Sequence, residues 1–162
     1  MNVPVRYAPK NLTRKDRKQQ FQQLAKSRNL YKRGKYYTRK QVKSFKSRKS
    51  NHLSRARALY GVDKIRPDKE LASATGCSVE ALEKIVNKGE GAYFSSGSRP
   101  NQTAQSWGLA RLASAITSGN ASIVDYHILE EGCDHSKTAF KLAKKRKSQG
   151  RIKKPKTIKL NE

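Results

Sequence analysis

The run from Gly89 to Gly119 constrains the fold more than any other part of the chain. It is the one long stretch in which glycines, small apolar residues and the sole tryptophan, Trp107, come together with few charges. Apolar residues recur in it at helical spacing and predict a helix from about Ala104 to Thr117. Thr103 can cap its start, and Gly119 can stop its end. Because this helix is apolar on nearly all sides, we expect it to be buried, with Trp107 in the core.

The net charge of +25 is concentrated at the two ends of the 162-residue chain. Residues 1–57 hold 19 Lys and Arg and one acid. Residues 58–140 hold eight Lys and Arg and ten acids, and residues 141–162 hold ten Lys and Arg and one acid. Ends of this charge density repel themselves unless something anionic neutralises them. The expected counterparts are nucleic acid, anionic lipid head groups or acidic faces of other proteins.

Charge and apolar periodicity together predict a mainly α fold, with a small helical core between two basic extensions. We expect a basic arm with short helices over residues 1–61, a globular helical core over residues 62–143, and a basic tail over residues 144–162. The tail carries so few apolar residues that we expect it to be disordered without a partner.

Capping residues and glycines place the individual helices. In the arm, the predicted starts are Thr13, Thr38 and Ser50, and the predicted stops are Gly34 and Gly61. In the core, the pattern predicts helices over residues 68–75, from Ser78 to Gly89, over 121–131 and over about 135–147. A strand over residues 122–129 is the alternative to the third of these, because Ile123-Val124 and Ile128-Leu129 favour strands.

The segment at 70–88 is similar to a helix-turn-helix, with a glycine between two short helices. A helix that reads the major groove presents basic or amide side chains. Here Glu80 and Glu83 point outward instead, and phosphates would repel them. The pattern therefore favours a helical hairpin used for packing over a groove reader.

Cys77 and Cys133 are isolated in the sequence, without the paired spacing of a metal site. We interpret them as two reduced structural cysteines in a cytosolic or nuclear environment. The chain has no apolar run at its start and no apolar stretch of about 18 residues, so we expect neither a signal peptide nor a transmembrane segment.

Aromatic residues interleave with the basic ones in the arm, at Tyr31, Tyr36, Tyr37 and Phe45. Basic side chains neutralise phosphates, and aromatic rings stack on exposed bases. The alternative is that these rings anchor the arm on a protein surface. The candidate residues for binding nucleic acid or another anionic partner are Arg14, Lys15, Arg17, Lys18, Lys32, Arg33, Lys35, Tyr36, Tyr37, Arg39, Lys40, Lys46, Arg48, Lys49, Lys144, Lys145, Arg146 and Lys147.

No catalytic constellation stands out, so we expect no enzyme activity, no cofactor and no metal. Ser95, Ser96, Ser98 and Arg99 could hold a phosphate ahead of the next helix, but the favoured interpretation is that Arg99 braces its own loop. Arg111 lies on a mostly buried helix and needs a partner. We expect that partner to be a core acid or the carbonyls of the 95–101 loop; the acids are Glu83, Glu90, Asp125, Glu130 and Glu131.

The run GAYFSSGSRPNQTAQSWGLARLAS resembles the signature of a small basic family of unknown function from large double-stranded DNA viruses. A looser form of it is similar to proteins of tailed phages. The residues that carry the resemblance are Gly89, Gly91, Ala92, Tyr93, Ser98, Arg99, Pro100, Trp107, Ala110 and Arg111. Since that family offers no catalytic residues, we expect the motif residues Gly89, Gly91, Tyr93, Ser98, Arg99, Pro100, Trp107 and Arg111 to be structural.

The resemblance implies a viral protein of the virion. The expected function is that of a minor capsid protein, whose basic extensions bridge other capsid proteins and the genome or an inner membrane. The expected partners are therefore other capsid proteins, with DNA or an anionic inner-membrane surface beside them. The expected location is the capsid, and the host cytoplasm or nucleus during assembly. The alternative function is a DNA-binding, genome-condensing protein.

Overall fold

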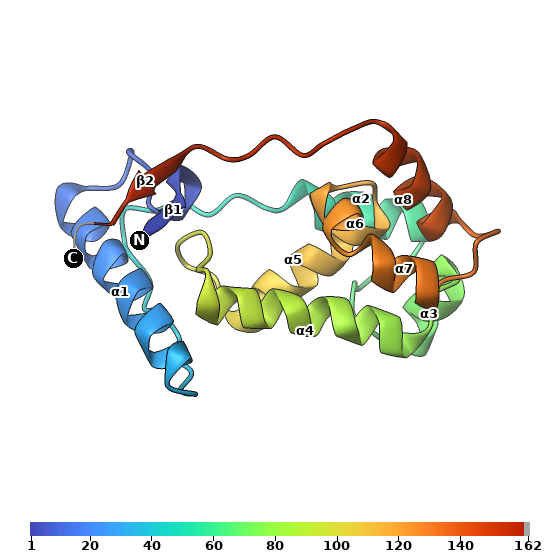
Figure 1. Cartoon of the computed structure of the whole chain (residues 1–162), viewed down its shortest axis with the longest axis horizontal. Helices are drawn as coiled ribbons and strands as arrows, with labels where there is room; N and C mark the ends of the chain where they lie inside the picture. Colours follow the sequence, from blue (N-terminus) through green and yellow to red (C-terminus); the bar gives the residue numbers. More distant parts are fainter. Residues whose placement is uncertain (161–162) are drawn as a thin grey trace. The chain divides into compact units, whose positions relative to one another are not determined.

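A computed structural model describes residues 1–160, and over these the chain is mainly α, as predicted. The chain contains eight α-helices and is 57% helical. The two named strands of the described residues pair in one small sheet. No helix in the described part is both long and apolar enough to cross a membrane. In chain order the elements are β1 (Asn2–Pro4), η1 (Val5–Tyr7, a 3₁₀ helix), α1 (Arg14–Lys32), α2 (Asn51–Tyr60), α3 (Lys69–Thr75), α4 (Val79–Ser95), α5 (Ala104–Ile116), α6 (Asn120–Val124), α7 (Tyr126–Gly132), α8 (Thr138–Ser148) and β2 (Thr157–Lys159) (Figure 1).

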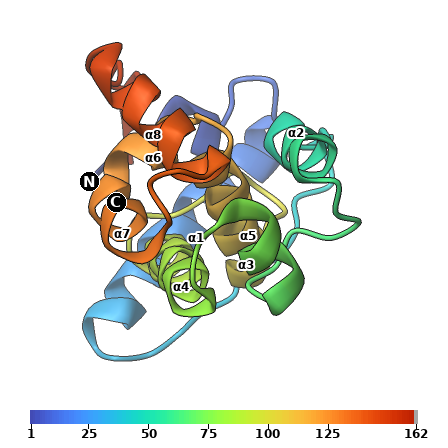
Figure 2. The ribbon, with the colours of Figure 1, turned by 90° about the vertical axis from the view of Figure 1, so that its right-hand side faces the viewer.

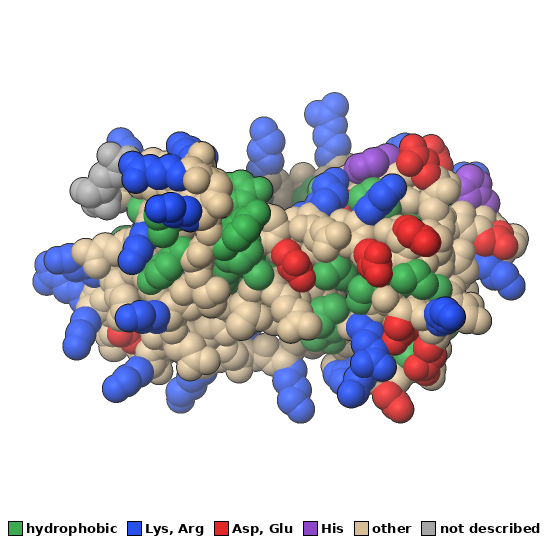
Figure 3. Space-filling model, turned by 90° about the horizontal axis from the view of Figure 1, so that it is seen from below, with side chains coloured by type: hydrophobic (Ala, Val, Ile, Leu, Met, Phe, Trp, Pro, Cys, Tyr) green, Lys and Arg blue, Asp and Glu red, His purple; other side chains and the backbone are tan. Residues whose placement is uncertain are grey.

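The chain folds into two compact units whose segments alternate along the sequence. The first unit combines residues 1–49, residues 90–107 and the last segment from residue 153, and the second combines residues 50–89 and 108–152. This division differs from the predicted one, because both basic ends belong to a folded unit. On the face drawn in Figure 3, Lys and Arg side chains project from the end of the molecule shown on the left, and acidic side chains are few there.

The C-terminal tail takes part in the core of the first unit, so the prediction of a disordered tail is wrong. β2 pairs antiparallel with β1, with Val3 opposite Ile158. Val3 and Leu160 are buried with Tyr7 and Leu24. The physical reason is alternation: polar and apolar residues alternate from Thr157 to Leu160, so Ile158 and Leu160 pack inward while Thr157 and Lys159 stay exposed.

Trp107 also belongs to this first core, at its edge. The indole is partly buried and meets the ring of Tyr7 edge-to-face, with 5.9 Å between ring centroids. The expectation that Trp107 lies in the core is therefore only partly right, because the ring packs against the core and keeps some exposed surface. The buried part of α5 is its C-terminal half, where Leu112 and Ile116 have no exposed surface.

α1 begins where the sequence predicts, because the Thr13 hydroxyl accepts the Asp16 amide. The helix that was predicted to start at Thr38 is absent, because residues 35–50 are irregular. Two side-chain amides hold that segment extended. Gln23 binds both the N–H and the C=O of Lys40, and Asn101 binds both of these groups of Val42. These bonds take the place of a neighbouring strand.

The second unit contains α2, α3 and α6 to α8, together with most of α4 and α5. α3 is capped by Asp68 and ends at Gly76 in the left-handed conformation, with φ of 78°, as predicted. The helix predicted over 121–131 is two helices, α6 and α7, which meet at Asp125, and the alternative of a strand is wrong. The views in Figures 1 and 2 agree that α6, α7 and α8 lie side by side.

α4 continues six residues beyond its predicted end at Gly89. Gly89 is not a stop signal but a point of close approach. A Cβ atom on Gly89 would lie 2.6 Å from the Cα of Gly108 on α5, so only glycine lets the two backbones meet there. Gly91 has no such neighbour, because a Cβ there would meet only the Tyr31 hydroxyl at 3.9 Å.

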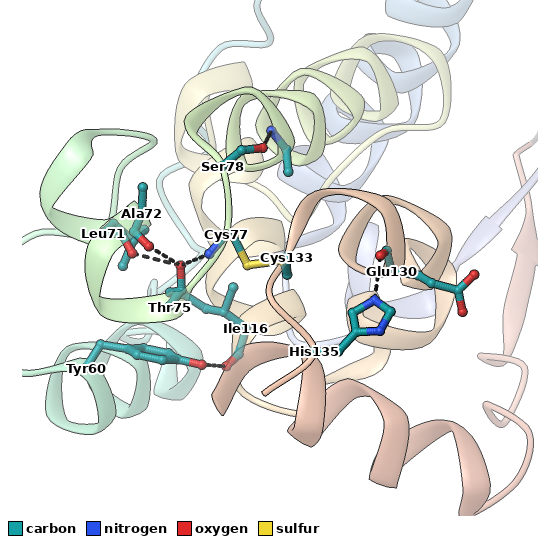
Figure 4. Close-up of a disulfide and its surroundings, with 11 residues drawn as sticks. Tyr60, Leu71, Ala72, Thr75, Cys77, Ser78, Ile116, Glu130, Cys133 and His135 are labelled. Atoms are coloured by element: carbon teal, nitrogen blue, oxygen red, sulfur yellow. Dashed lines mark hydrogen bonds between the residues drawn. A yellow bond between two sulfur atoms is a disulfide. The ribbon is translucent and has the colours of Figure 1, made fainter. Parts of the chain in front are cut away.

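Cys77 and Cys133 form a disulfide, so the interpretation of two reduced thiols is wrong (Figure 4). The backbone brings them together as an isolated antiparallel bridge. The amide of Ser78 donates to the carbonyl of Gly132 at 2.8 Å, and the amide of Asp134 donates to that of Gly76 at 2.7 Å. The two cysteines are 56 residues apart. Sequence spacing therefore gives no sign of the pairing, which depends on how α7 returns to the α3–α4 turn.

The two glycines of α4 make a matched pair for a test of this close approach. We expect Gly89→Ala to lower the free energy of unfolding by about 1–3 kcal/mol, because its methyl group meets backbone that cannot move aside. We expect Gly91→Ala to raise it by about 0.5–1 kcal/mol, through helix propensity alone. Urea denaturation followed by circular dichroism measures both. Two variants of equal stability would contradict the account.

Candidate nucleic-acid interface

The two units differ strongly in charge. The first unit contains 22 Lys and Arg and three acids, whereas the second contains 15 Lys and Arg and nine acids. The excess positive charge is therefore +19 on the first unit and +6 on the second. The candidate interface is the surface of the first unit.

α1 presents a basic face to solvent. Its inner face is buried through Gln20, Gln23, Leu24 and Ser27. The exposed basic residues of the other side lie in the first turns, in the second half of the helix and at its C-cap, and they are Arg14, Lys15, Lys18, Lys26, Lys32 and Arg33. A solvated helix face normally mixes both signs, since like charges four residues apart destabilise a helix. This face contains no acid to relieve that repulsion.

Asp16 is the one acid of α1, and it is used inside the fold. Its carboxylate accepts the Ser44 amide at 2.8 Å. Hydrogen bonds from the side chain and the backbone of Ser44 lower the pKa of Asp16, so this carboxylate stays ionised well into the acidic range. Asp16 therefore ties residues 35–50 to α1.

A cleft with a volume of about 590 Å³ opens beside the start of α1. Arg17 is held there over the ring of Phe21, with 5.2 Å from the guanidinium carbon to the ring centroid. None of the charged residues that line the cleft has an ion pair within the described chain. Four of its seven lining residues are basic, and the full set is Lys10, Leu12, Arg14, Arg17, Lys18, Phe21 and Gln22.

Arg39 was predicted to contact an anionic partner, but it is only 7% exposed and binds inside the protein. Its guanidinium donates to the Ser27 hydroxyl at 2.9 Å, to the Tyr93 carbonyl at 2.8 Å and to the Ser98 hydroxyl at 2.8 Å. It also lies over the Tyr93 ring, 3.8 Å from the centroid. Burial lowers the pKa of this guanidinium, although it stays charged at any physiological pH. The prediction for Arg39 is wrong because the basic run of the arm conceals one residue that turns inward.

The same contacts explain two residues of the motif. Tyr93 and Ser98 are fully buried, and both accept from Arg39. Arg99 was expected to brace the loop, but its side chain is exposed and has no hydrogen bond to the described residues. Arg39 performs the bracing that the sequence analysis assigned to Arg99. The loop serines bond locally: Ser98 donates to the Arg99 carbonyl, and Ser95 and Ser96 contact each other.

Arg111 pairs with a core acid, as predicted. Its guanidinium binds both carboxylate oxygens of Asp125 at 2.7 Å, and Lys88 lies 3.2 Å from the same carboxylate. Asp125 has no exposed surface. Arg111 therefore holds the junction of α6 and α7 in the second unit and is structural.

The remaining candidates lie mainly on the surface. Lys35, Lys40, Lys46, Arg48 and Lys49 are exposed in the irregular segment, together with Tyr36 at 72%. Tyr37 is partly covered by Lys26, whose ammonium lies 4.5 Å from the ring centroid. On α8, which belongs to the second unit, Lys144, Lys145 and Lys147 are exposed, and Arg146 binds Asn120 at 3.3 Å.

Comparison with known proteins identifies the family. The Family of unknown function (DUF5824) matches residues 4–128, which cover most of the chain. This chain belongs to DUF5824. No curated protein and no solved structure matches it. The DUF5824 match begins before α1 and ends within α7, so it includes the basic face, Arg39 and Tyr93. The viral origin and the capsid role stay predictions.

Three polar residues organise the first unit of this DUF5824 chain in a way that its sequence did not predict: Gln23, Arg39 and Asn101. One signal was present for the first of them. Gln20, Gln23 and Ser27 fall on one side of α1 beside Leu24, and a polar residue within the apolar side of a helix needs an internal partner. No local pattern distinguishes Arg39 from its exposed neighbours.

Replacing Arg39 tests its structural role. We expect Arg39→Ala to lower the free energy of unfolding by about 2–4 kcal/mol, because it leaves buried oxygens of Ser27, Tyr93 and Ser98 without donors. Fluorescence of Trp107, the sole tryptophan and part of the first unit, reports the transition. The matched control is Lys40→Ala, whose side chain is exposed, and it should change stability by less than about 0.5 kcal/mol. Equal stability of the two variants would contradict the assignment.

Proposed function

We propose that this DUF5824 protein binds nucleic acid through the basic surface of its first unit. The observation that supports the proposal is the +19 charge of that unit, whose sequence contains 22 Lys and Arg and three acids. Phosphate neutralisation supplies most of the affinity in such complexes and releases the counterions condensed on the nucleic acid. Because α1 holds its basic residues in a fixed row, they lose little conformational freedom on binding.

The fold favours nucleic acid over insertion into a lipid surface. A helix that lies in a membrane interface buries an apolar face among the lipids. The inner face of α1 is already covered by its own unit, where Leu24 is 2% exposed and Gln23 is engaged with Lys40. What α1 offers to a partner is mainly charge, with the ring of Tyr31 exposed near its end. The basic cleft beside Arg17 and Phe21 offers in addition a recess in which a phosphate is met from several sides.

A second candidate function is a structural component of a virion, as the resemblance of the motif implies. The disulfide between Cys77 and Cys133 favours it, because such bonds persist in oxidising surroundings, including the surfaces of virions. The two functions are compatible, since a minor capsid protein can face the genome. Copurification with shells that lack DNA would support the capsid role.

Salt dependence tests the proposal for nucleic acid. We expect the logarithm of the association constant for a single-stranded oligonucleotide to fall steeply and linearly with the logarithm of the salt concentration. The triple variant Lys15→Gln, Lys18→Gln, Lys32→Gln removes three exposed charges from α1. We expect it to reduce the slope by about two, at about 0.7 counterions for each phosphate contact. Fluorescence anisotropy titrations at several salt concentrations measure the slope.

The matched control removes three exposed lysines from the second unit: Lys64→Gln, Lys69→Gln and Lys84→Gln. It has the same net charge as the α1 variant, and its slope should equal that of the unaltered protein. Binding that does not respond to salt, or an equal loss of slope in both triple variants, would contradict a specific role for α1.

A further inference from the structure

We propose that the rings of Tyr31, Tyr36 and Phe94 form an aromatic platform on which unstacked bases of single-stranded nucleic acid stack. The inference rests on the proposed function, because the surrounding charges are what bring a strand to the rings. It goes further by naming the substrate class: strands whose bases are free, rather than duplexes.

The exposure of Tyr36 is the first observation. At 72% it is the most exposed large hydrophobic side chain of the described residues, and Tyr31 is 38% exposed. By contrast, two other aromatic residues of the first unit are buried, Tyr93 at 0% and Tyr7 at 7% exposure. A ring left in water forgoes about 1.5–3 kcal/mol of burial free energy. Folding therefore gains little from Tyr36, which argues against a ring that anchors the arm on its own protein.

The rings contact one another in a fixed cluster. Tyr36 lies 5.0 Å from Phe94 and 6.2 Å from Tyr31 between ring centroids, and both pairs are tilted. Gly34, with φ of 74°, turns the chain at the end of α1, and the amide of Lys35 returns to the Leu30 carbonyl at 2.9 Å. This turn brings Tyr36 back against Phe94.

The base of the platform is fixed to the core of the first unit. The Ser27 hydroxyl donates to the Phe94 carbonyl at 3.1 Å, and the Phe94 ring meets that of buried Tyr93 at 5.1 Å. Both Ser27 and Tyr93 are held by Arg39. The platform is thus ordered before any ligand arrives, so little freedom is lost when a base stacks on it.

Charge identifies the occupant. Lys32, Arg33 and Lys35 are exposed in the turn between Tyr31 and Tyr36, and none has an ion pair in the described chain. Aromatic rings set in a basic surface are the arrangement that binds single strands, with phosphates on the cations and base faces on the rings. A duplex offers no free base faces except at its ends, so it cannot use the platform.

Removing the bases from the ligand separates stacking from charge. The experiment measures, at one salt concentration, the affinities of the unaltered protein and of Tyr36→Ala for three ligands: an oligothymidylate, a strand of abasic sites of equal length, and a duplex. We expect Tyr36→Ala to weaken binding of the oligothymidylate by about 5- to 150-fold, the range for loss of stacking on one base. Binding of the abasic strand and of the duplex should change less than about twofold, because the phosphate contacts remain.

Two further variants complete the test. Tyr36→Trp keeps a ring and should bind the oligothymidylate at least as well as the unaltered protein. Leu59→Ala removes a 48% exposed apolar side chain from the second unit and should change nothing. Equal weakening for the base-bearing and abasic strands, or no preference for bases in the unaltered protein, would overturn the platform while leaving the charge-based function intact. Failure of every ligand to bind would overturn the proposed function itself.

Discussion

The guanidinium of Arg39 joins segments that are far apart in the sequence: α1 through Ser27, the end of α4 through Tyr93, and the following loop through Ser98. Residues 1–49 carry 17 Lys and Arg and one acid, so ion pairs contribute little to holding this segment together. Directional hydrogen bonds from buried polar side chains take over that task. Gln23 and Asn101 continue it just after Arg39, where each binds the backbone of one residue of the extended segment, Lys40 and Val42. All three acceptors of Arg39 are neutral, so its charge adds to the positive potential of the unit.

This organisation explains how such a basic surface can be folded before a polyanion binds to it. A disordered basic arm loses conformational entropy when a polyanion orders it. Here α1 is already packed through its inner face, the tail is paired as β2, and Asp16 fixes the extended segment at Ser44. The basic face, the cleft at Arg17 and the rings around Tyr36 are therefore parts of one folded unit. The second unit has its own core, with the buried Arg111–Asp125 pair and the disulfide.

Local signals predicted the helices well and the tertiary arrangement poorly. Caps at Thr13 and Asp68 and the stop at Gly76 act within a few residues, so α1 and α3 could be placed from sequence. The strand at 157–159 and the Cys77–Cys133 bond depend on contacts with distant segments, and no local pattern encodes those. In the site, the exposed lysines and Tyr36 were recognised by composition. Arg39 was predicted to be exposed but is buried, because nothing in a basic run of sequence distinguishes a buried arginine from its exposed neighbours.

The central claim is that residues 1–49 are folded in the absence of any partner. Hydrogen bonds from Arg39 and from the side-chain amides of Gln23 and Asn101 hold them. Native-state hydrogen exchange of the free protein at low ionic strength, resolved by residue, tests it most directly. The account predicts strong protection of the α1 amides and of the amides of Arg39, Lys40 and Val42, which donate to Tyr93, Gln23 and Asn101. In Arg39→Ala, the backbone amides of residues 39 and 42 should lose their protection against exchange. Exchange of these amides at the rate of an unfolded chain, with protection gained only when nucleic acid is added, would contradict the account.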